Sequence, residues 1–198
     1  MQKIVLSNMA DLRINYYEGT CETFYANISC GERESIFLYD GKCTERIECG
    51  VVSLYFFENC EKNKINVNLK IDDEQIEIVL EKSPYEEVFM ADLQKIVDSS
   101  DEIQIVEQAS GEKASLQKTS KSFKVNYKKA IKLAVEYFDD VLNGLYFKNK
   151  LNAECYLKVL AKKGYEQIFW YFSIIDISGV NYSMLINVNT GEIVGNKK

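Results

Sequence analysis

Six cysteines are the residues of this 198-residue chain whose chemistry best suits metal binding or redox reactions. No two of them form a Cys-x-x-Cys pair and the chain contains no histidine, so the ligand spacing of a zinc site is missing. We therefore expect free thiols that are mostly buried as small hydrophobic side chains, with a cysteine-only metal site as the alternative. The six are Cys21, Cys30, Cys43, Cys49, Cys60 and Cys155.

Catalytic motifs are missing from the sequence. Without histidine there is no Ser-His or Cys-His pair to activate a nucleophile. The sequence also contains no Gly-x-Ser-x-Gly turn, no phosphate-binding Gly-x-x-x-x-Gly-Lys loop and no dinucleotide-binding Gly-x-Gly-x-x-Gly turn. We therefore expect a protein that is not an enzyme and needs no cofactor or metal. A hydrolase that uses carboxylates alone stays open as an alternative.

Clusters of adjacent carboxylates recur in the first half of the chain. Such clusters can act as acid and base, hold a divalent ion or attract a basic partner, but their most common use is to keep a surface solvated. Their spacing matches no calcium-binding loop. We interpret them as candidate partner-binding residues for a basic protein. The candidates are Asp72, Asp73, Glu74, Glu86, Glu87, Asp98, Asp101 and Glu102.

The two halves of the chain differ in charge. Residues 1–108 carry ten basic and twenty-two acidic residues, a net charge of −12, whereas residues 109–198 have a net charge of +6. Seven lysines between 113 and 132 alternate with Phe123 and Tyr127, which is a pattern that can bind nucleic acid. We disfavour that function because this stretch has no arginine and the whole chain has a net charge of −6.

The elements expected in the first half are mostly strands. Apolar residues alternate with polar ones over 65–71 and return at 76–80, which predicts a hairpin around the Asp72-Asp73-Glu74 turn. Ser83-Pro84, with Glu86 completing a capping box, predicts a helix over 84–98, and a strand is expected over 102–108. Further short strands are expected at 24–28, 36–38, 47 and 52–56, with a hairpin turn at Asp40-Gly41.

The second half is expected to combine helix and strand. Asn126 is placed to cap an amphipathic helix that ends at Gly144. The segment 153–163 fits both periods, and we favour a helix over a strand. Strands are expected at 166–176, 180–188 and 192–194, with a turn at Asn189-Thr190-Gly191 and with Trp170 in the core.

These elements predict an α+β fold. An antiparallel β-meander with one helix is followed by a helical segment packed on a small C-terminal antiparallel sheet. The expected division is an acidic β-rich domain at 1–108, a lysine-rich linker or loop at 109–122 and an α+β domain at 123–198.

The C-terminal region resembles the bacterial PepSY-type module. Lys129-Ala130-Ile131 opens a helix, a strand follows at 168–175, and Tyr182–Val188 then runs into the Thr190-Gly191-Glu192 turn. The resemblance covers residues 126–194 and implies a small helix-and-sheet module. The sequence has asparagine where that family has an aspartate before the turn, and it has a long insertion between 137 and 155. No functional residue is carried over from the family.

Localisation and partner follow from the same features. No stretch has the length of an apolar membrane span and no secretory signal is recognisable, so we expect a cytoplasmic protein without a membrane partner. Small, acidic chains without catalytic motifs resemble bacterial toxin-immunity proteins in style. Our main hypothesis is therefore an inhibitor that neutralises a basic toxin, with a small-molecule or peptide-binding module as the alternative.

Overall fold

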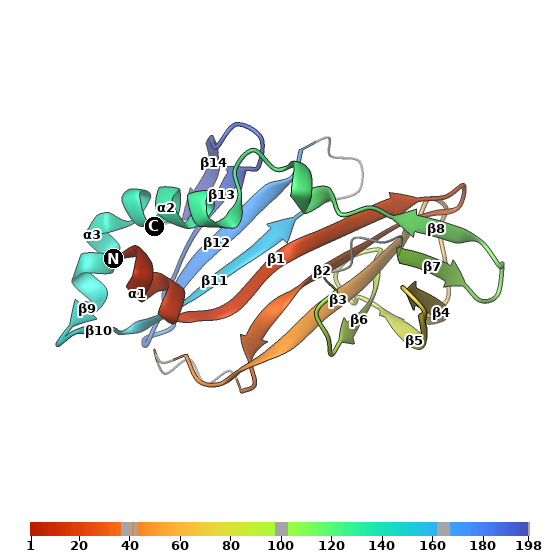
Figure 1. Ribbon diagram of the computed structural model, residues 1–198, viewed down its shortest axis with the longest axis horizontal. Coiled ribbons are helices and arrows are strands. Elements are labelled where there is room, and N and C mark those ends of the chain that lie inside the picture. Colours follow the sequence, from red (N-terminus) through yellow and green to blue (C-terminus); the bar gives the residue numbers. More distant parts are fainter. Residues whose placement is uncertain (37–40, 42, 98–102, 162–166, 198) are drawn as a thin grey trace. The chain divides into compact units, whose positions relative to one another are not determined.

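The computed structural model shows a mostly β protein (Figure 1). It describes residues 1–36, 41, 43–97, 103–161 and 167–197. Strands hold 53% of the chain and helices 16%, so the prediction of a balanced α+β fold is wrong. The largest element is a mixed sheet of twelve strands, in place of the small C-terminal sheet that we expected.

The first half of the chain is built from long strands that follow a short helix. Phe24 and Leu54 are fully buried, and buried residues alternate with more exposed ones most regularly over residues 64–71. The elements are α1 (Gln2–Ser7), β1 (Met9–Thr20), β2 (Phe24–Glu34), β3 (Arg46–Phe56), β4 (Lys64–Ile71), β5 (Glu74–Lys82), β6 (Phe89–Leu93) and β7 (Ile103–Glu107).

The second half adds the remaining helices and strands. Its elements are β8 (Lys113–Leu116), η1 (Thr119–Ser122), α2 (Tyr127–Tyr137), α3 (Asp139–Leu145), β9 (Tyr146–Phe147), β10 (Lys150–Leu151), β11 (Ala153–Leu160), β12 (Phe169–Asp176), β13 (Asn181–Asn187) and β14 (Ile193–Lys197). The strand order is β14-β13-β12-β11-β1-β2-β3-β6-β5-β4-β7-β8, and β9 and β10 pair separately.

The chain folds into two compact units that are interleaved along the sequence. Unit 1 contains residues 1–14, 32–47 and 122–198, and unit 2 contains residues 15–31 and 48–121. Strands β1, β2 and β3 contribute residues to both units. The expected division was sequential, and the segment expected as a linker, 109–122, contains strand β8 and helix η1.

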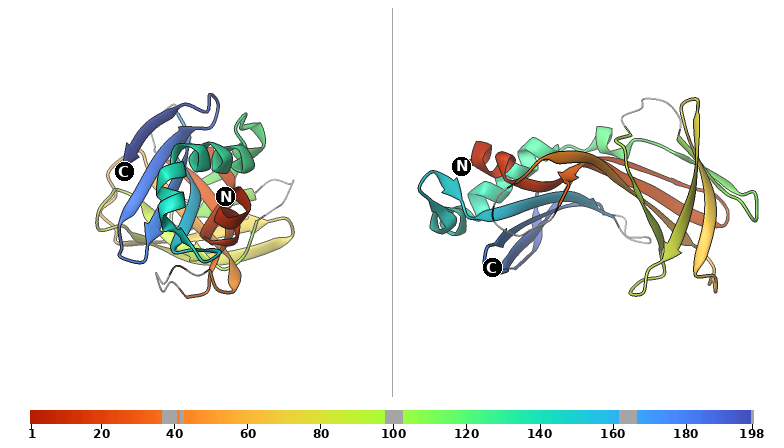
Figure 2. Two further views of the ribbon diagram at one scale, coloured as in Figure 1. Left: turned by 90° about the vertical axis from the view of Figure 1, so that its left-hand side faces the viewer. Right: turned by 90° about the horizontal axis from the view of Figure 1, so that it is seen from below.

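In unit 1, helices cover one face of a sheet (Figure 2). Strands β11 to β14 pair antiparallel, whereas β1 pairs in parallel with β11. Helix α2 begins where expected, because Asn126 accepts a hydrogen bond from the Lys129 amide at 3.0 Å. Phe138 from the junction of α2 and α3 stacks on Phe172 of β12 at 6.3 Å, and Trp170 is 1% exposed, which confirms its place in the core.

In unit 2, an antiparallel sheet curls around its own core. Glu18 of β1 bridges to Gln117, next to β8, so the first and last strands of this unit meet. Gly19 permits that approach, because a Cβ atom there would lie 2.1 Å from the Ser115 carbonyl oxygen. The core consists of inward side chains from every strand of the unit, including Phe24, Leu54, Leu69, Leu80, Phe89 and Ile105.

Two predicted helices are strands. The segment expected to be helical at 84–98 contains β6, whose residues Phe89 to Leu93 pair with β3. Residues 153–160 of the favoured helix at 153–163 form β11, which pairs with β12 along its length and with β1 at Cys155 to Leu157. Residues 162 and 163 lie outside the described residues. In both segments the apolar residues also alternate, and pairing with distant strands outweighs the local helical signal.

The remaining predicted elements fare better. The hairpin of β4 and β5 is confirmed, with Asp72 at φ 52° in its turn. Strands β7, β12, β13 and β14 confirm the expected strands, and Gly191 has φ 79° in the expected turn. The predicted helix from 126 is divided in two at Phe138. Residues 37, 38 and 40 of two expected elements lie outside the described residues. No described helix has the length and apolarity needed to cross a membrane.

Candidate functional site

The predicted acidic surface is divided by strand β5. Asp72 and Asp73 form the turn before β5 and Glu74 begins it, whereas Glu86 and Glu87 follow its end. The nine residues of β5 extend over about 27 Å at roughly 3.4 Å per residue. Asp98, Asp101 and Glu102 lie outside the described residues. The described members of the set therefore form two separate groups and not one patch.

Each group is partly neutralised within unit 2. Lys95 forms an ion pair with Glu74 at 2.5 Å, and Lys82 forms one with Glu87 at 2.7 Å. Exposed pairs of this kind add about 0–1 kcal/mol to stability, but they reduce the field available to a partner.

A groove of about 660 Å³ opens at the end of unit 2 that carries Glu87. It lies between the turn after β1, the connection from β3 to β4 and the turn after β7. Its volume is within the range of ligand sites, about 300–1,000 Å³. The lining residues are Glu22, Thr23, Phe56, Phe57, Glu58, Asn59, Cys60, Glu61, Lys62, Glu107, Ala109 and Ser110.

Two phenylalanines form the aromatic part of the groove. Phe56 meets the rings of Phe24 and Phe89 edge-on, at centroid distances of 6.2 and 5.7 Å. The Phe57 amide donates to the Thr23 carbonyl at 2.9 Å, while the Phe57 side chain is 47% exposed. The core therefore holds one ring in place, and the backbone presents the other to solvent.

Glu107 is the buried carboxylate of the groove, at 3% exposure. Its Oε2 accepts from the Ser110 amide at 2.7 Å, and its Oε1 lies 3.8 Å from Lys62 Nζ. Burial acts to raise the pKa of Glu107, but hydrogen bonds from Ser110 and Ala109 and the charge of Lys62 outweigh it, so this pKa lies below its usual value. The groove therefore holds a fixed negative charge at neutral pH.

Three more carboxylates line the groove from exposed positions. They are Glu22, Glu58 and Glu61, and none forms an ion pair within the described part of the chain. Lys82 joins this site to Glu87, because its Nζ also donates to the Cys60 carbonyl at 3.0 Å. The groove thus offers four carboxylates against one lining lysine, beside two aromatic rings.

This arrangement suits the binding of a cation. Carboxylates attract a positive charge, and aromatic faces add a cation–π contribution of about 0.5–2 kcal/mol. It does not support the carboxylate-hydrolase alternative, since a carboxyl group that acts as a general acid needs a raised pKa and that of Glu107 is lowered.

Sequence reasoning missed the groove because its residues come from three distant segments. Glu22, the 56–62 connection and Glu107 become neighbours only through sheet pairing. The local signal was Phe56-Phe57-Glu58-Asn59-Cys60-Glu61-Lys62, where exposed aromatic and acidic residues lie together between two strands.

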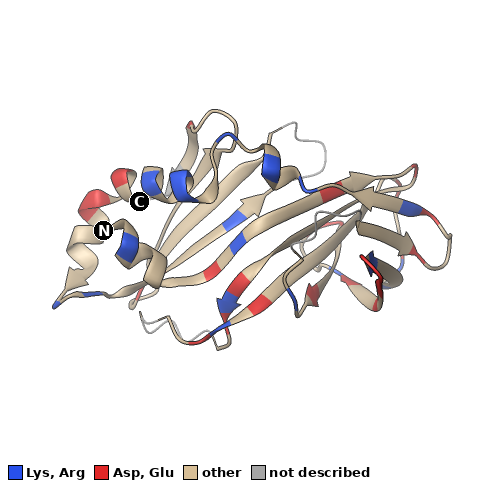
Figure 3. Cartoon of the chain, viewed as in Figure 1, with Lys and Arg blue, Asp and Glu red and all other residues tan. Residues whose placement is uncertain are grey.

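The lysine-rich stretch is divided between the two units. Its first lysines belong to unit 2 and its later ones to α2 of unit 1, where they appear as blue segments (Figure 3). Phe123, one of its two aromatic residues, packs edge-on against Trp170 at 5.6 Å. That ring is engaged by the core of unit 1, which does not favour base stacking.

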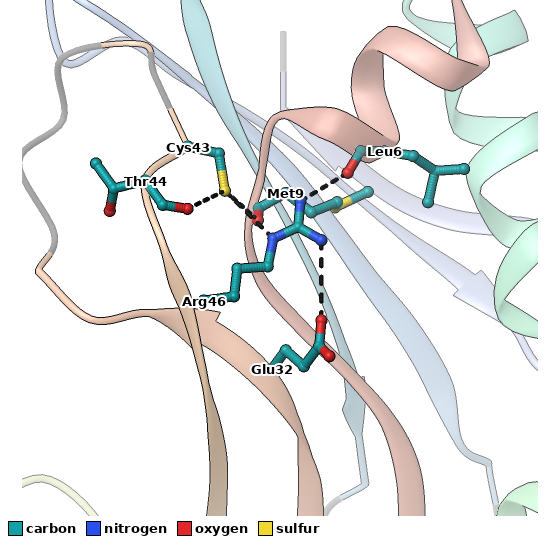
Figure 4. Close-up of polar contacts among 6 residues, drawn as sticks. All are labelled: Leu6, Met9, Glu32, Cys43, Thr44 and Arg46. Atoms are coloured by element: carbon teal, nitrogen blue, oxygen red, sulfur yellow. Dashed lines mark hydrogen bonds and ion pairs between the residues drawn. The ribbon is translucent and has the colours of Figure 1, made fainter.

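A separate polar cluster surrounds Arg46 in unit 1 (Figure 4). Arg46 donates from Nη2 to the Leu6 carbonyl at 2.8 Å and from Nε to Cys43 Sγ at 3.3 Å, and Nη1 lies 4.0 Å from Glu32. The Cys43 thiol donates to the Met9 carbonyl at 2.9 Å. Burial raises the pKa of Cys43, so this thiol is a donor and not an activated nucleophile. The cluster ties the chain around Cys43 to α1 and β1.

All six cysteines carry free thiols, as expected, and Cys30, Cys49 and Cys155 are buried. Among the described residues, no three acidic or cysteine side chains are grouped to hold a metal ion. The chain has no significant match among protein-family models, curated proteins or solved structures. The PepSY-type resemblance therefore stays a prediction.

Proposed function

We propose that this protein binds other molecules without chemical conversion, and that the groove of unit 2 receives a basic side chain of a partner protein or peptide. The observation that carries the proposal is the groove itself. Four carboxylates and two phenylalanines line about 660 Å³, against one lysine. Unit 2 as a whole contains eight basic and eighteen acidic residues, a net charge of −10, which favours encounter with a basic partner.

The groove favours a peptide or small ligand, and not a flat protein surface, as the bound species. Its volume matches the side chains of a few residues, and the predicted acidic patches lie apart. Our hypothesis of a toxin-neutralising protein is compatible with this proposal if the toxin inserts a lysine or arginine into the groove. Its test is a one-to-one complex with a basic toxin that groove variants abolish.

The direct experiment is calorimetric titration with an acetylated hexalysine peptide. We expect binding that weakens as salt rises, since the contacts are ionic. Glu58→Gln with Glu61→Gln removes two exposed carboxylates without touching the core, and we expect roughly tenfold weaker binding from the loss of about 1.4 kcal/mol.

The matched control is Asp73→Asn with Glu77→Gln, which also removes two exposed carboxylates of unit 2, outside the groove. Equal binding by the double variant and this control would show that only net charge matters, and would refute the groove as the site. Phe57→Ala tests the aromatic part, since Phe57 is 47% exposed and its loss leaves the core intact.

A further inference from the structure

Unit 1 carries a second cavity on the sheet face opposite its helices. The cavity has a volume of about 160 Å³ and lies over β1, β11, β12 and β13. A water molecule occupies about 30 Å³ in the liquid, so the space fits a small molecule or one side chain. Its polar lining residues are Asp11, Tyr156, Lys158, Tyr171, Ser173 and Asn181.

Two buried oxygen atoms beside this cavity accept no hydrogen bond from the described part of the chain. Glu154 is 1% exposed, and its Oε2 accepts from the hydroxyl of Tyr156, a lining residue, at 2.7 Å. No donor from the described residues reaches Glu154 Oε1, nor the buried Oδ1 of Asn181. Nearly all buried polar atoms in folded proteins have a partner, because losing hydration without a replacement costs free energy.

The strand register places these two acceptors on one row. Glu154 of β11 pairs with Ile175 of β12, and Ile175 pairs with Asn181 of β13. Residues directly opposite on paired strands point to the same face, and two strand spacings make about 10 Å between the outer backbones. The side chains of Glu154 and Asn181 therefore flank Ile175, which lines the cavity, on the same face of the sheet.

Among the described residues, the cationic side chains near the cavity, Arg13 and Lys158, contact other groups. Arg13 donates from Nε and Nη2 to Asp11 at 2.9 and 2.8 Å, and Lys158 Nζ lies 5.6 Å from the centre of the Tyr171 ring. A metal ion would need more ligands than this row supplies, and the described residues contain no cluster of three suitable side chains. The oxygen atoms of Glu154 and Asn181 therefore require N–H or O–H donors.

We propose that this cavity is a binding site for a small organic cation with two or more N–H donors, of the guanidinium or primary ammonium class. The donors would bridge Glu154 Oε1 and Asn181 Oδ1. The negative carboxyl group of Glu154 selects a cation over a neutral donor, because a hydrogen bond to a charged group is stronger. The site lies wholly in unit 1, so it is independent of the groove in unit 2.

The experiment is an amide chemical-shift titration of the ¹⁵N-labelled full chain with methylguanidinium chloride. We expect saturable shifts at 154–158, 171–175 and 181–183. Two further probes separate charge from hydrogen bonding: urea has the donors without the charge, and tetramethylammonium has the charge without the donors. We expect weak binding of urea and none of tetramethylammonium.

Variants of the two acceptors sharpen the test. Glu154→Gln is expected to weaken methylguanidinium binding by about tenfold or more, the effect of losing one charged hydrogen bond. Glu192→Gln is the matched control, because it makes the same change at an exposed position of the same unit. If Glu154→Gln does not fold, two variants of Asn181 test the proposal instead. Asn181→Asp should raise the affinity for methylguanidinium, and Asn181→Leu should lower it.

Three results would overturn the proposal. They are an absence of shifts at the named residues, equal binding of methylguanidinium and tetramethylammonium, and equal affinity of both Asn181 variants. Each would indicate that ordinary hydration satisfies these oxygen atoms. None would affect the groove, whose probe and residues are different.

Discussion

The two units of this chain use sheets in different ways. In unit 1, helices α1, α2 and α3 cover one face of the sheet, and polar residues collect on the other face around a cavity of about 160 Å³. In unit 2, whose described residues contain no α-helix, the sheet closes on its own core and leaves a groove of about 660 Å³ at one end. In unit 1 the space for a ligand lies on the sheet face that the helices do not cover. In unit 2 it lies at one end of the curled sheet.

Their charges differ as well. Unit 1 has sixteen basic and twelve acidic residues, a net charge of +4, against −10 for unit 2. The asymmetry seen along the sequence therefore persists in the folded units, although their segments interleave. The ligand proposed for each unit is a cation, although unit 1 has a net positive charge. Local carboxyl groups, and not the net charge of the unit, therefore select the ligand in unit 1.

The largest expected effect concerns the helix-covered core. Phe172→Ala removes a fully buried ring that stacks on Phe138, and we expect a loss of about 3–5 kcal/mol in the free energy of unfolding. Urea denaturation followed by circular dichroism measures it. Ile177→Ala is the control in the same unit, because Ile177 is 63% exposed and its loss is expected to cost little. Equal losses would mean that helix packing does not stabilise unit 1.

The next effect tests the closure of unit 2. Gly19→Ala places a Cβ atom 2.1 Å from a backbone oxygen, which cannot move aside as a side chain can. We expect a loss of at least about 2 kcal/mol, in the upper part of the range for overpacking. Gly144→Ala is the comparison in helix α3 of unit 1. Its Cβ has no atom within 4 Å, and we expect a gain of up to about 1 kcal/mol. A neutral Gly19→Ala would contradict the close approach of β1 and β8.

A smaller effect concerns Glu107. Its pKa is lower folded than unfolded, so its charge stabilises the fold above about pH 4.3, and this contribution disappears as the pH falls through the folded pKa. Glu107→Gln is expected to cost about 1.5 kcal/mol at pH 7, the value of a hydrogen bond to a charged group. The difference from the unmodified protein should vanish in acid. A pH-independent difference would contradict the ionic role.

The smallest expected effect concerns Asp176, a carboxylate of unit 1 whose pKa is also lowered by hydrogen bonds. The Ser178 hydroxyl and the amides of Ser178 and Val180 donate to Asp176 Oδ1 at 2.6 to 2.9 Å, and these bonds lower the pKa of Asp176. Asp176→Asn keeps an acceptor oxygen, so we expect a loss of about 1 kcal/mol above pH 4 that fades in acid. No lysine contributes to the lowered pKa of Asp176, whereas Glu107 faces Lys62. Added salt should therefore change the stability loss of Asp176→Asn less than that of Glu107→Gln. Salt titration of both variants checks this ordering.

Local patterns predicted the strands better than the helices. The alternation at 65–71 identified β4 because one face of that strand is buried, and the Asn126 cap identified α2 because its hydrogen bond is local. Phe89 and Leu93 satisfy helical spacing and strand alternation equally well. The partner that decides between them is β3, some forty residues away. The same holds for β11, whose neighbour β1 is more than 140 residues distant.

The site depended still more on distant contacts. The sequence identified carboxylates as binding residues, but Asp72 and Glu86 are the most conspicuous because they lie in exposed turns. Glu107 is the more instructive residue. It occurs singly, it is buried, and its setting comes from Ser110 and Lys62. Counting adjacent charges cannot find a site of this kind, because the site is a product of the sheet's pairing.

The most direct test of the account is an amide chemical-shift titration of the ¹⁵N-labelled protein with acetylated hexalysine. We predict the largest shifts within residues 22–23, 56–62 and 107–110, the segments that line the groove. Shifts centred on 72–74, at the opposite end of β5, or an absence of saturable shifts in unit 2, would contradict it.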